Sequence, residues 1–251
     1  WATSSGSTDF ARPDDVGATL REVPEVHSIK SMSASGGGGI AAVGSDVAER
    51  SGLIWIEEGL TGHSWHAYAD NRELTDVAVI ERDAEDDTIV LVGHGGEETI
   101  DGHIKLVGRN GEVLWASSFG NPGVAREDTP TVGLASNRFI FDECWGVAQA
   151  GDQIVAACGT GIEGCDAVPA DPEERDLCST DPRRSWRSYL VGLSTAGEVL
   201  WSRAESFVDE TGEAAESAAE FLVVDDEQAI YTVVDHNFGV GLARFGGEQA
   251  P

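Results

Sequence analysis

One short segment carries the residue types that bind metal ions. His94 ends an apolar stretch and His103 begins the next, and Glu97 and Asp101 lie in the turn-rich segment between them. Two imidazoles with nearby carboxylates suit copper, zinc or iron. The sequence therefore predicts a candidate metal site at His94, Glu97, Asp101 and His103, with an unliganded polar hairpin tip as the alternative. No cofactor is identified by name: a transition metal here, or calcium on the many other carboxylates, are the candidates.

A second group of residues has the composition of a binding surface. Basic residues are scarce in this chain, with 16 Lys and Arg against 45 Asp and Glu, yet three arginines surround one tryptophan. Arg and Trp are enriched at binding hot spots. We therefore expect a protein or small-molecule partner to contact Arg183, Arg184, Trp186 and Arg187. Pairing of these arginines with acidic residues of their own loop is the alternative.

The four cysteines are clustered and predict disulfides. Their spacings match no common zinc pattern of short-spaced pairs, and an even, clustered set is typical of an oxidising compartment. Cys144 and Cys158 flank a predicted Gly-Asp hairpin turn, and Cys165 and Cys178 bracket a polar loop. We therefore favour the pairs Cys144–Cys158 and Cys165–Cys178, and two other pairings stay open. The expected location is extracytoplasmic and bacterial: periplasmic, cell-surface or secreted.

Composition excludes several classes of function. The 251 residues carry a formal charge of −29, which argues against nucleic acid and anionic membranes as partners. Apolar runs are only of strand length, so no transmembrane segment is expected. Residues 1–16, rich in Ser, Thr and Gly, are expected to be a flexible tether, as where a secretion signal or lipoprotein leader has been removed. Ser64 lacks the sequence context of a nucleophile elbow.

An internal repeat organises the elements that must position these residues. Gly-Glu-Val-Leu-Trp occurs twice, ending at Trp115 and at Trp201, and a weaker copy ends at Trp65. Upstream of each copy stands an apolar segment that ends in glycine, at Gly44, Gly93 or Gly159. Four-stranded antiparallel modules at a pitch near 50 residues are typical of a β-propeller, in which the three tryptophans would pack between blades.

The predicted architecture is an all-β propeller of four four-stranded blades. A fourth copy begins near Ser217 and lacks its last strand, so we expect Gly17–Val23 to complete it and close the ring. Residues 17–251 would then form one domain, with a disulfide-held insertion at about 160–187. Two alternatives stay open: a fifth blade within Asn121–Asp142, and half of a dimeric eight-bladed ring. The oligomeric state is therefore monomer or homodimer.

The strand–glycine–strand–Gly-Glu-Val-Leu-Trp pattern resembles the repeat of bacterial PQQ-like propeller proteins, which include quinoprotein dehydrogenases and outer-membrane assembly lipoproteins. The resemblance covers about 180 residues, with two clear copies. Quinoproteins have larger rings than four blades and often a disulfide between adjacent cysteines. This sequence has no two adjacent cysteines, so no PQQ is expected. Because propellers present rigid loops at the ends of the ring and the sequence has no legible catalytic motif, we expect an exported, non-enzymatic binding or scaffold module that recognises a protein or other ligand through its loops. A metal-binding propeller and a propeller lyase or hydrolase are the alternatives.

Overall fold

The computed structural model describes a chain built almost entirely of antiparallel strands. The described residues are 23–80, 87–95, 101–119, 142–161, 186–205, 207–208, 214–215, 217–236 and 239–246. Their strands form three four-stranded sheets, one three-stranded sheet and a two-stranded ribbon. In the described part of the chain, no helix is long and apolar enough to cross a membrane.

The sheets follow one another along the chain, each built from consecutive strands, and we call the four larger ones blades 1 to 4. Blade 1 holds β1 (Val26–Ala34), β2 (Ile40–Asp46), β3 (Ser51–Ile56) and β4 (His63–Ala67), with the short helix η1 (Glu58–Leu60) before β4. Blade 2 holds β5 (Asn71–Ile80), β6 (Thr88–Gly95), β7 (Asp101–Gly108) and β8 (Val113–Phe119). Blade 3 holds β9 (Glu143–Ala150), β10 (Gln153–Gly161), β11 (Trp186–Ser194) and β12 (Val199–Glu205). Blade 4 holds β15 (Ser217–Val224), β16 (Ile230–His236) and β17 (Gly239–Phe245), and the ribbon is β13 (Phe207–Val208) with β14 (Ala214–Ala215).

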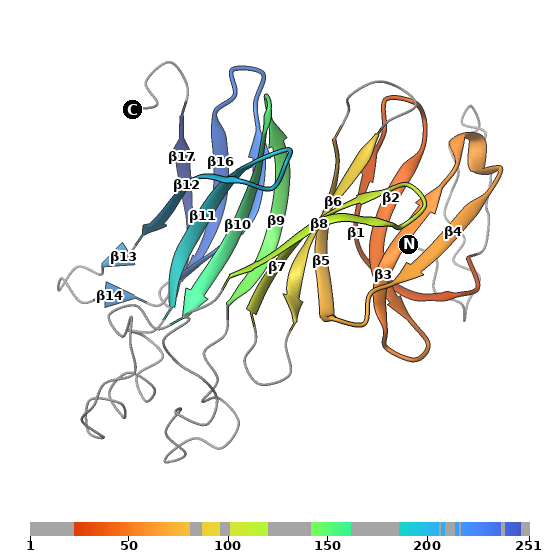
Figure 1. Cartoon of the computed structure of the whole chain (residues 1–251). Coiled ribbons are helices and arrows are strands. Elements are labelled where there is room, and N and C mark those ends of the chain that lie inside the picture. The colour runs from red at the N-terminus through yellow and green to blue at the C-terminus, as the bar shows by residue number, and fades with distance from the viewer. Residues whose placement is uncertain are drawn as a thin grey trace, which may run out of the picture.

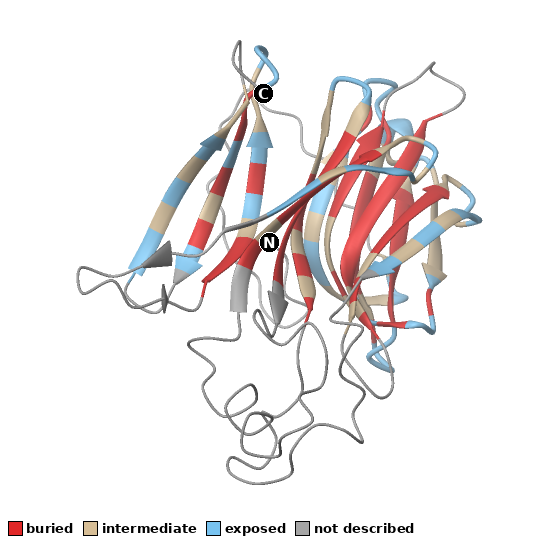
Figure 2. Ribbon diagram, turned by 60° about the vertical axis from the view of Figure 1, so that its left-hand side comes forward, coloured by how far each residue is buried: buried red, intermediate tan, exposed pale blue. Residues whose placement is uncertain are grey.

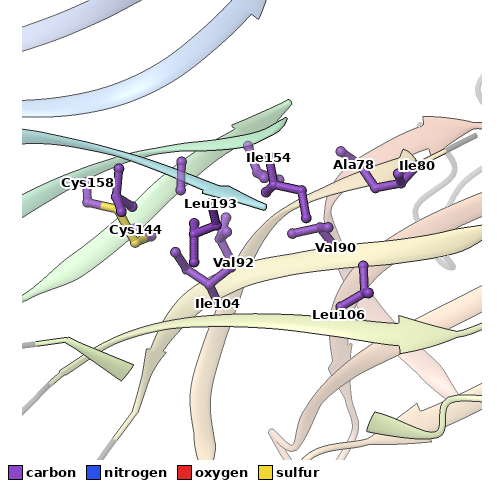
Figure 3. Close-up of a cluster of buried hydrophobic side chains, with 13 residues drawn as sticks. Ala78, Ile80, Val90, Val92, Ile104, Leu106, Cys144, Ile154, Cys158 and Leu193 are labelled. Atoms are coloured by element: carbon purple, nitrogen blue, oxygen red, sulfur yellow. A yellow bond between two sulfur atoms is a disulfide. The ribbon is translucent and has the colours of Figure 1, made fainter. Parts of the chain in front are cut away.

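The blades stack face to face and bury their apolar strands between them (Figures 1 and 2). Each neighbouring pair of blades encloses its own apolar cluster, because strands with apolar residues on both faces must be covered on both sides. Figure 3 shows the cluster between blades 2 and 3, which includes Val90, Val92, Ile104, Ile154 and Leu193. The predicted fold class, a blade-type β-propeller architecture, is therefore confirmed.

The first strand of each blade carries the packing between blades. β5 lies across β1, β2 and β3, β9 lies across β5, β6 and β7, and β15 lies across β9, β10 and β11. The outermost strands β4, β8 and β12 make no comparable contact with one another in the described part of the chain. The blades therefore converge at their first strands, which form the inner side of the array.

A β-bulge in the first strand explains the glycine that ends the second strand. β1 is bulged between Ile29 and Ser31, and β5 between Leu74 and Asp76. The bulged backbone passes directly over the second strand, so a Cβ atom on Gly93 would lie 2.1 Å from the carbonyl oxygen of Glu73. Gly44 is crowded in the same way by β1. The recurring glycine is thus required by the close approach of two backbones.

One buried carboxylate ties three blades together. Asp76 on β5 accepts a hydrogen bond from the Ser31 hydroxyl of β1 (2.5 Å) and another from the Val147 backbone N–H of β9 (2.8 Å). Thr75, beside it, donates to the carbonyl oxygen of Cys144 (2.5 Å). Burial raises the pKa of Asp76, against the opposing effect of these hydrogen bonds. These contacts fix the position of β5 between its neighbours.

The tryptophan positions differ between blades. Trp115 on β8 packs against the cluster between blades 2 and 3, and its indole Nε1 donates to the carbonyl oxygen of Thr195 in blade 3 (3.1 Å). Trp201 on β12 packs against the cluster between blades 3 and 4. Trp65 pairs with Ile54, on the opposite face of blade 1 from the residues that contact blade 2, and covers Gly52. The expected wedge between blades therefore exists at Trp115 and Trp201 but not at Trp65.

In blade 1 a different aromatic residue makes the contact with the next blade. Tyr68, just after β4, is buried in the cluster between blades 1 and 2, and its hydroxyl donates to the carbonyl oxygen of Gly111 (3.1 Å). Gly111 and Gly197 occupy equivalent hairpin turns with positive φ, 77° and 86°. The Gly111 turn receives Tyr68 and His66, and the Gly197 turn receives Trp115, so in both the glycine leaves room for a ring from the preceding blade.

Blades 1 and 4 are the two ends of the array (Figure 1). Blade 4 has three strands among the described residues, and the outer edge of β17 has no strand partner there. Gly17–Val23, the segment expected to complete this blade, lies outside the described residues except for Val23, so that closure stays a prediction. Residues 1–16 and the stretch 121–141, where a fifth blade was the alternative, also lie outside them.

Candidate functional site

An ionisable cluster joins three blades at the inner strands. Glu73 is the third residue of β5, His94 lies near the end of β6, and Glu143 begins β9. The His94 ring lies 4.0 Å (Nε2) from an oxygen of Glu73 and 3.9 Å (Nδ1) from an oxygen of Glu143, while Lys30 of β1 contacts Glu73 at 2.6 Å. We call these four residues the His94 cluster. Its interior is His94 and Glu143, whose side chains are 13% and 20% exposed.

The register of the strands explains why these side chains meet. Glu73 and His94 are directly paired across β5 and β6, and the β5 bulge follows immediately. His94 shares a sheet face with Val90 and Val92, which face blade 3. Glu143 precedes Cys144, whose backbone is held against β5 by the Thr75 hydrogen bond. The packing of blade 3 on blade 2 therefore brings Glu143 to His94.

Burial gives this cluster unusual protonation behaviour. Burial, with the negative charges of Glu73 and Asp142, raises the pKa of Glu143 to about 7. Burial also lowers the pKa of His94, although Glu73 acts in the opposite direction. At neutral pH the imidazole is therefore mainly neutral and the Glu143 carboxyl is protonated in about half of the molecules. Such a pair can hold, give up or accept a proton at physiological pH.

A second ionisable group lies on the other face of blade 2. Lys105 on β7 is 2% exposed, and its ammonium contacts Asp70 at 2.5 Å and lies 5.2 Å from the centre of the Tyr68 ring. Burial, followed by the charge of Asp70, raises the pKa of Tyr68 to about 12. Burial and then the Lys105 charge lower the pKa of His103. Asp70 and Tyr68 therefore supply the counter-charge and the ring contact that a buried lysine between blades 1 and 2 needs, which is a structural role.

The predicted metal ligands do not converge in the described structure. His94 pairs with Gly102, and His103 pairs with Gly93, so the two imidazoles lie on opposite faces of the sheet. His94 faces blade 3 and His103 faces blade 1, and Asp101, opposite Gly95, shares the face of His103. Glu97 lies outside the described residues. Within the described ranges, no group of three or more His, Cys, Asp and Glu side chains is arranged to hold a metal.

The remaining predicted residues are placed only in part. Cys144 and Cys158 form a disulfide across β9 and β10, the pairing that the sequence favoured (Figure 3). Cys165 and Cys178 lie outside the described residues, as do Arg183 and Arg184. Trp186 and Arg187 begin β11, where their backbones pair with Gly161 and Thr160.

Sequence reasoning missed Glu73, Glu143 and Lys30. Carboxylates are too numerous, at 45 in the chain, for any one of them to stand out. The usable signal is position: Glu73 comes two residues before the bulge that faces Gly93, and Glu143 comes directly before the first cysteine. Both are charged residues at the start of otherwise apolar inner strands.

Comparison with known proteins adds little about this site. No protein-family model matches the chain, and no curated protein does. The chain is similar to the solved structure of a mutant apocarotenoid oxygenase from Synechocystis, with a TM-score of 0.40 and 12% identity over 91% of this chain. The chain spans about half of that structure's length, since the match covers 49% of it.

Proposed function

We propose that this protein is an exported, non-enzymatic binding module that captures a positively charged ligand, such as a basic peptide, at one end of the stacked blades. The observation that carries the proposal is that the His94 cluster lies at the end of the blades where the described strands that flank the longest connections finish and begin. The stacked, hydrogen-bonded blades supply a rigid support, and long connections on rigid scaffolds are where binding residues concentrate.

The antiparallel order of the strands defines that end. Three strands, β6, β8 and β10, end there, and the strands that follow them, β7, β9 and β11, begin there. The chain therefore leaves and re-enters the blades at this end for residues 96–100, 120–141 and 162–185. Glu73, His94 and Glu143 all occupy strand positions within a few residues of it. The turn between β15 and β16 and the turns that join β7 to β8, β9 to β10 and β11 to β12 lie at the other end.

Charge indicates the class of ligand. The binding end carries Asp70, Glu73, Asp101, Asp142 and Glu143; Lys105 pairs with Asp70 and Lys30 with Glu73, so acids still outnumber bases there, and the whole chain has a net charge of −29. Such a field attracts cations and repels anions over the range that salt allows. The disulfide between Cys144 and Cys158 supports an oxidising, extracytoplasmic compartment for this encounter.

The test uses arrayed synthetic peptides of three kinds, rich in Lys and Arg, rich in Asp and Glu, or uncharged, matched in length and apolar content. We expect the protein to retain the basic peptides, and less so as salt is raised. Combining Glu73→Gln with Glu143→Gln should weaken retention about tenfold, at about 1 kcal/mol for Glu73 and about half of that for Glu143, which is only partly ionised at neutral pH. Retention of the uncharged peptides alone would refute the proposal.

The matched control removes the same charge at the other end of the blades. Asp226→Asn with Glu227→Gln changes two exposed carboxylates in the β15–β16 turn. This variant should retain basic peptides as the unmodified protein does. An equal loss in both double variants would show that net charge, rather than the binding end, governs retention.

A second candidate function is acid–base catalysis, as in a lyase or hydrolase. The specific observation in its favour is that Glu143, whose pKa is raised to about 7, lies 3.9 Å from the His94 ring, whose pKa burial lowers. A panel of esters, lactones and glycosides would reveal such turnover. Glu143→Gln should abolish it, together with any inflection of the pH–rate profile near pH 7, and unchanged turnover in that variant would reject this candidate.

A further inference from the structure

The two end blades expose apolar faces that the inner blades bury. On blade 4, the outward positions of the three strands include Phe221, Val223, Tyr231, Val240 and Leu242, and Leu242 is 84% exposed. On blade 1, Ile29 and Met32 of β1 point away from blade 2, and Met32 is 63% exposed, whereas Ala42 and Ile54 on the same face of β2 and β3 are buried. These seven residues are more than half of the twelve large apolar side chains that are exposed among the described residues. Contiguous exposed apolar surface of this kind marks an interaction site.

The repeat itself shows what covers such a face. At each of the three interfaces inside the chain, the first strand of one blade lies across the first three strands of the blade before it. Blade 4 presents three such strands, β15, β16 and β17, with nothing across their outward face among the described residues. Among the first strands of the four blades, β1 is the one that has no preceding blade to pack on in the described structure. The natural cover for the outward face of blade 4 is therefore the outward face of β1.

This contact does not form within one chain of the described structure. Blades 1 and 4 lie at opposite ends of the array (Figure 1), and neither packs on the other. Asp76 holds blades 1, 2 and 3 in fixed relation through its bonds to Ser31 and Val147. The β1 strand that covers blade 4 must then come from another molecule.

We infer that two copies of this chain associate head to tail, with β1 of each copy packed on the outward face of blade 4 of the other. Two such contacts, related by a twofold axis, close the pair into one ring of eight blades and leave no end face exposed. The arrangement buries Met32 and Leu242 of both copies.

The charge of the contact surface fits this partner. The outward positions of β16 and β17 hold one acid and one base among apolar side chains, namely Tyr231, Val233, Asp235, Val240, Leu242 and Arg244, and Glu220 of β15 adds a second acid beside Asp235. A chain with 45 acidic residues has thus kept this face nearly neutral. Repulsion between two copies of charge −29 acts at longer range and is screened by salt, so association should strengthen as ionic strength rises.

Sedimentation equilibrium on the whole chain, over a range of protein and salt concentrations, tests the inference. We expect a dimer of twice the 26.5 kDa chain mass. Leu242→Asp and Met32→Asp should each raise the dissociation constant by roughly a hundredfold or more, because each places a charge in both contacts. Leu200→Asp, at an exposed apolar position on the outer strand β12, is the matched control and should leave the dimer intact.

Mixing distinguishes the head-to-tail ring from other assemblies. The Leu242→Asp chain keeps its β1 face, and the Met32→Asp chain keeps its blade 4 face, so an equimolar mixture should recover part of the association through one intact contact. A dimer that survives Met32→Asp unchanged would show that blade 4 pairs with itself and would overturn the inference. A monomer at every concentration, or filaments in place of a dimer, would also overturn it.

Discussion

The protonation of Glu143 gives a quantitative test of the His94 cluster. Replacing the carboxyl by an amide, Glu143→Gln, keeps the shape of the side chain and removes its charge. A pKa raised from 4.5 to about 7 means that the folded protein resists ionisation of this group. The unfolded chain ionises above pH 4.5, so the folded protein of the natural sequence loses stability as the pH rises from about 4.5 to 7 and remains less stable above that.

The size of the effect follows from the shift and the exposure. Moving the pKa from 4.5 to about 7 corresponds to about 3 kcal/mol, at 1.36 kcal/mol for each pKa unit. Because a fifth of the side chain is exposed, solvent screening reduces this figure. Between pH 5 and pH 8 the full shift would give about 2.5 kcal/mol by the same linkage, so after screening we expect the variant to gain about 2 kcal/mol of unfolding free energy relative to the natural sequence.

Urea denaturation at a series of pH values measures this difference directly. The range starts at pH 5 to stay above the isoelectric point, which is near 4.2. Contributions of other ionisable groups cancel in the difference between the two proteins. Glu227→Gln, which removes a carboxylate from an exposed turn, is the matched control. A difference between Glu143→Gln and the natural sequence that is constant from pH 5 to pH 8 would refute the described environment of Glu143.

Three further predictions concern the blades. Gly93→Ala should destabilise the protein by about 2 kcal/mol or more in urea denaturation, because its Cβ would meet the β5 backbone, and Gly37→Ala, with its nearest neighbour 3.4 Å away, should cost far less. Removing the disulfide by Cys144→Ala with Cys158→Ala should cost about 3 kcal/mol, seen as a melting temperature below that of the natural sequence under oxidising conditions. Asp76→Ala should cost about 2 to 3 kcal/mol by leaving a buried N–H unpaired, whereas Asp76→Asn should cost less; equal losses would contradict the assigned hydrogen bonds.

Features that recur in each copy of the blade repeat could be predicted from the sequence. The apolar segments ending in Gly44 and Gly93 mark second strands, because the bulged first strand excludes any side chain there. The hairpin between Cys144 and Cys158 was visible from its Gly-Asp turn. Trp115 and Trp201 share a motif and also share a role between blades.

Features that depend on strand register could not be predicted. Spacing suggested that His94 and His103 approach each other at a hairpin, but an offset of one residue in the pairing sends them to opposite faces. Strand register also determines the direction of Trp65: its pairing with Ile54 turns it away from blade 2, although its motif resembles those of Trp115 and Trp201. The His94 cluster depends on how blade 3 packs on blade 2, which no local pattern in the sequence records.

The bonds made by Asp76 also bear on how such an array can change during evolution. Duplicating a blade at the free end requires only a new apolar face, because β15 and β9 meet largely through backbone and apolar groups. Inserting one between blades 2 and 3 would leave the Val147 N–H without its acceptor and separate the Asp76 carboxylate from one of its two hydrogen-bond donors. The chain should therefore lengthen or shorten from its last blade, while the first three are inherited as a unit.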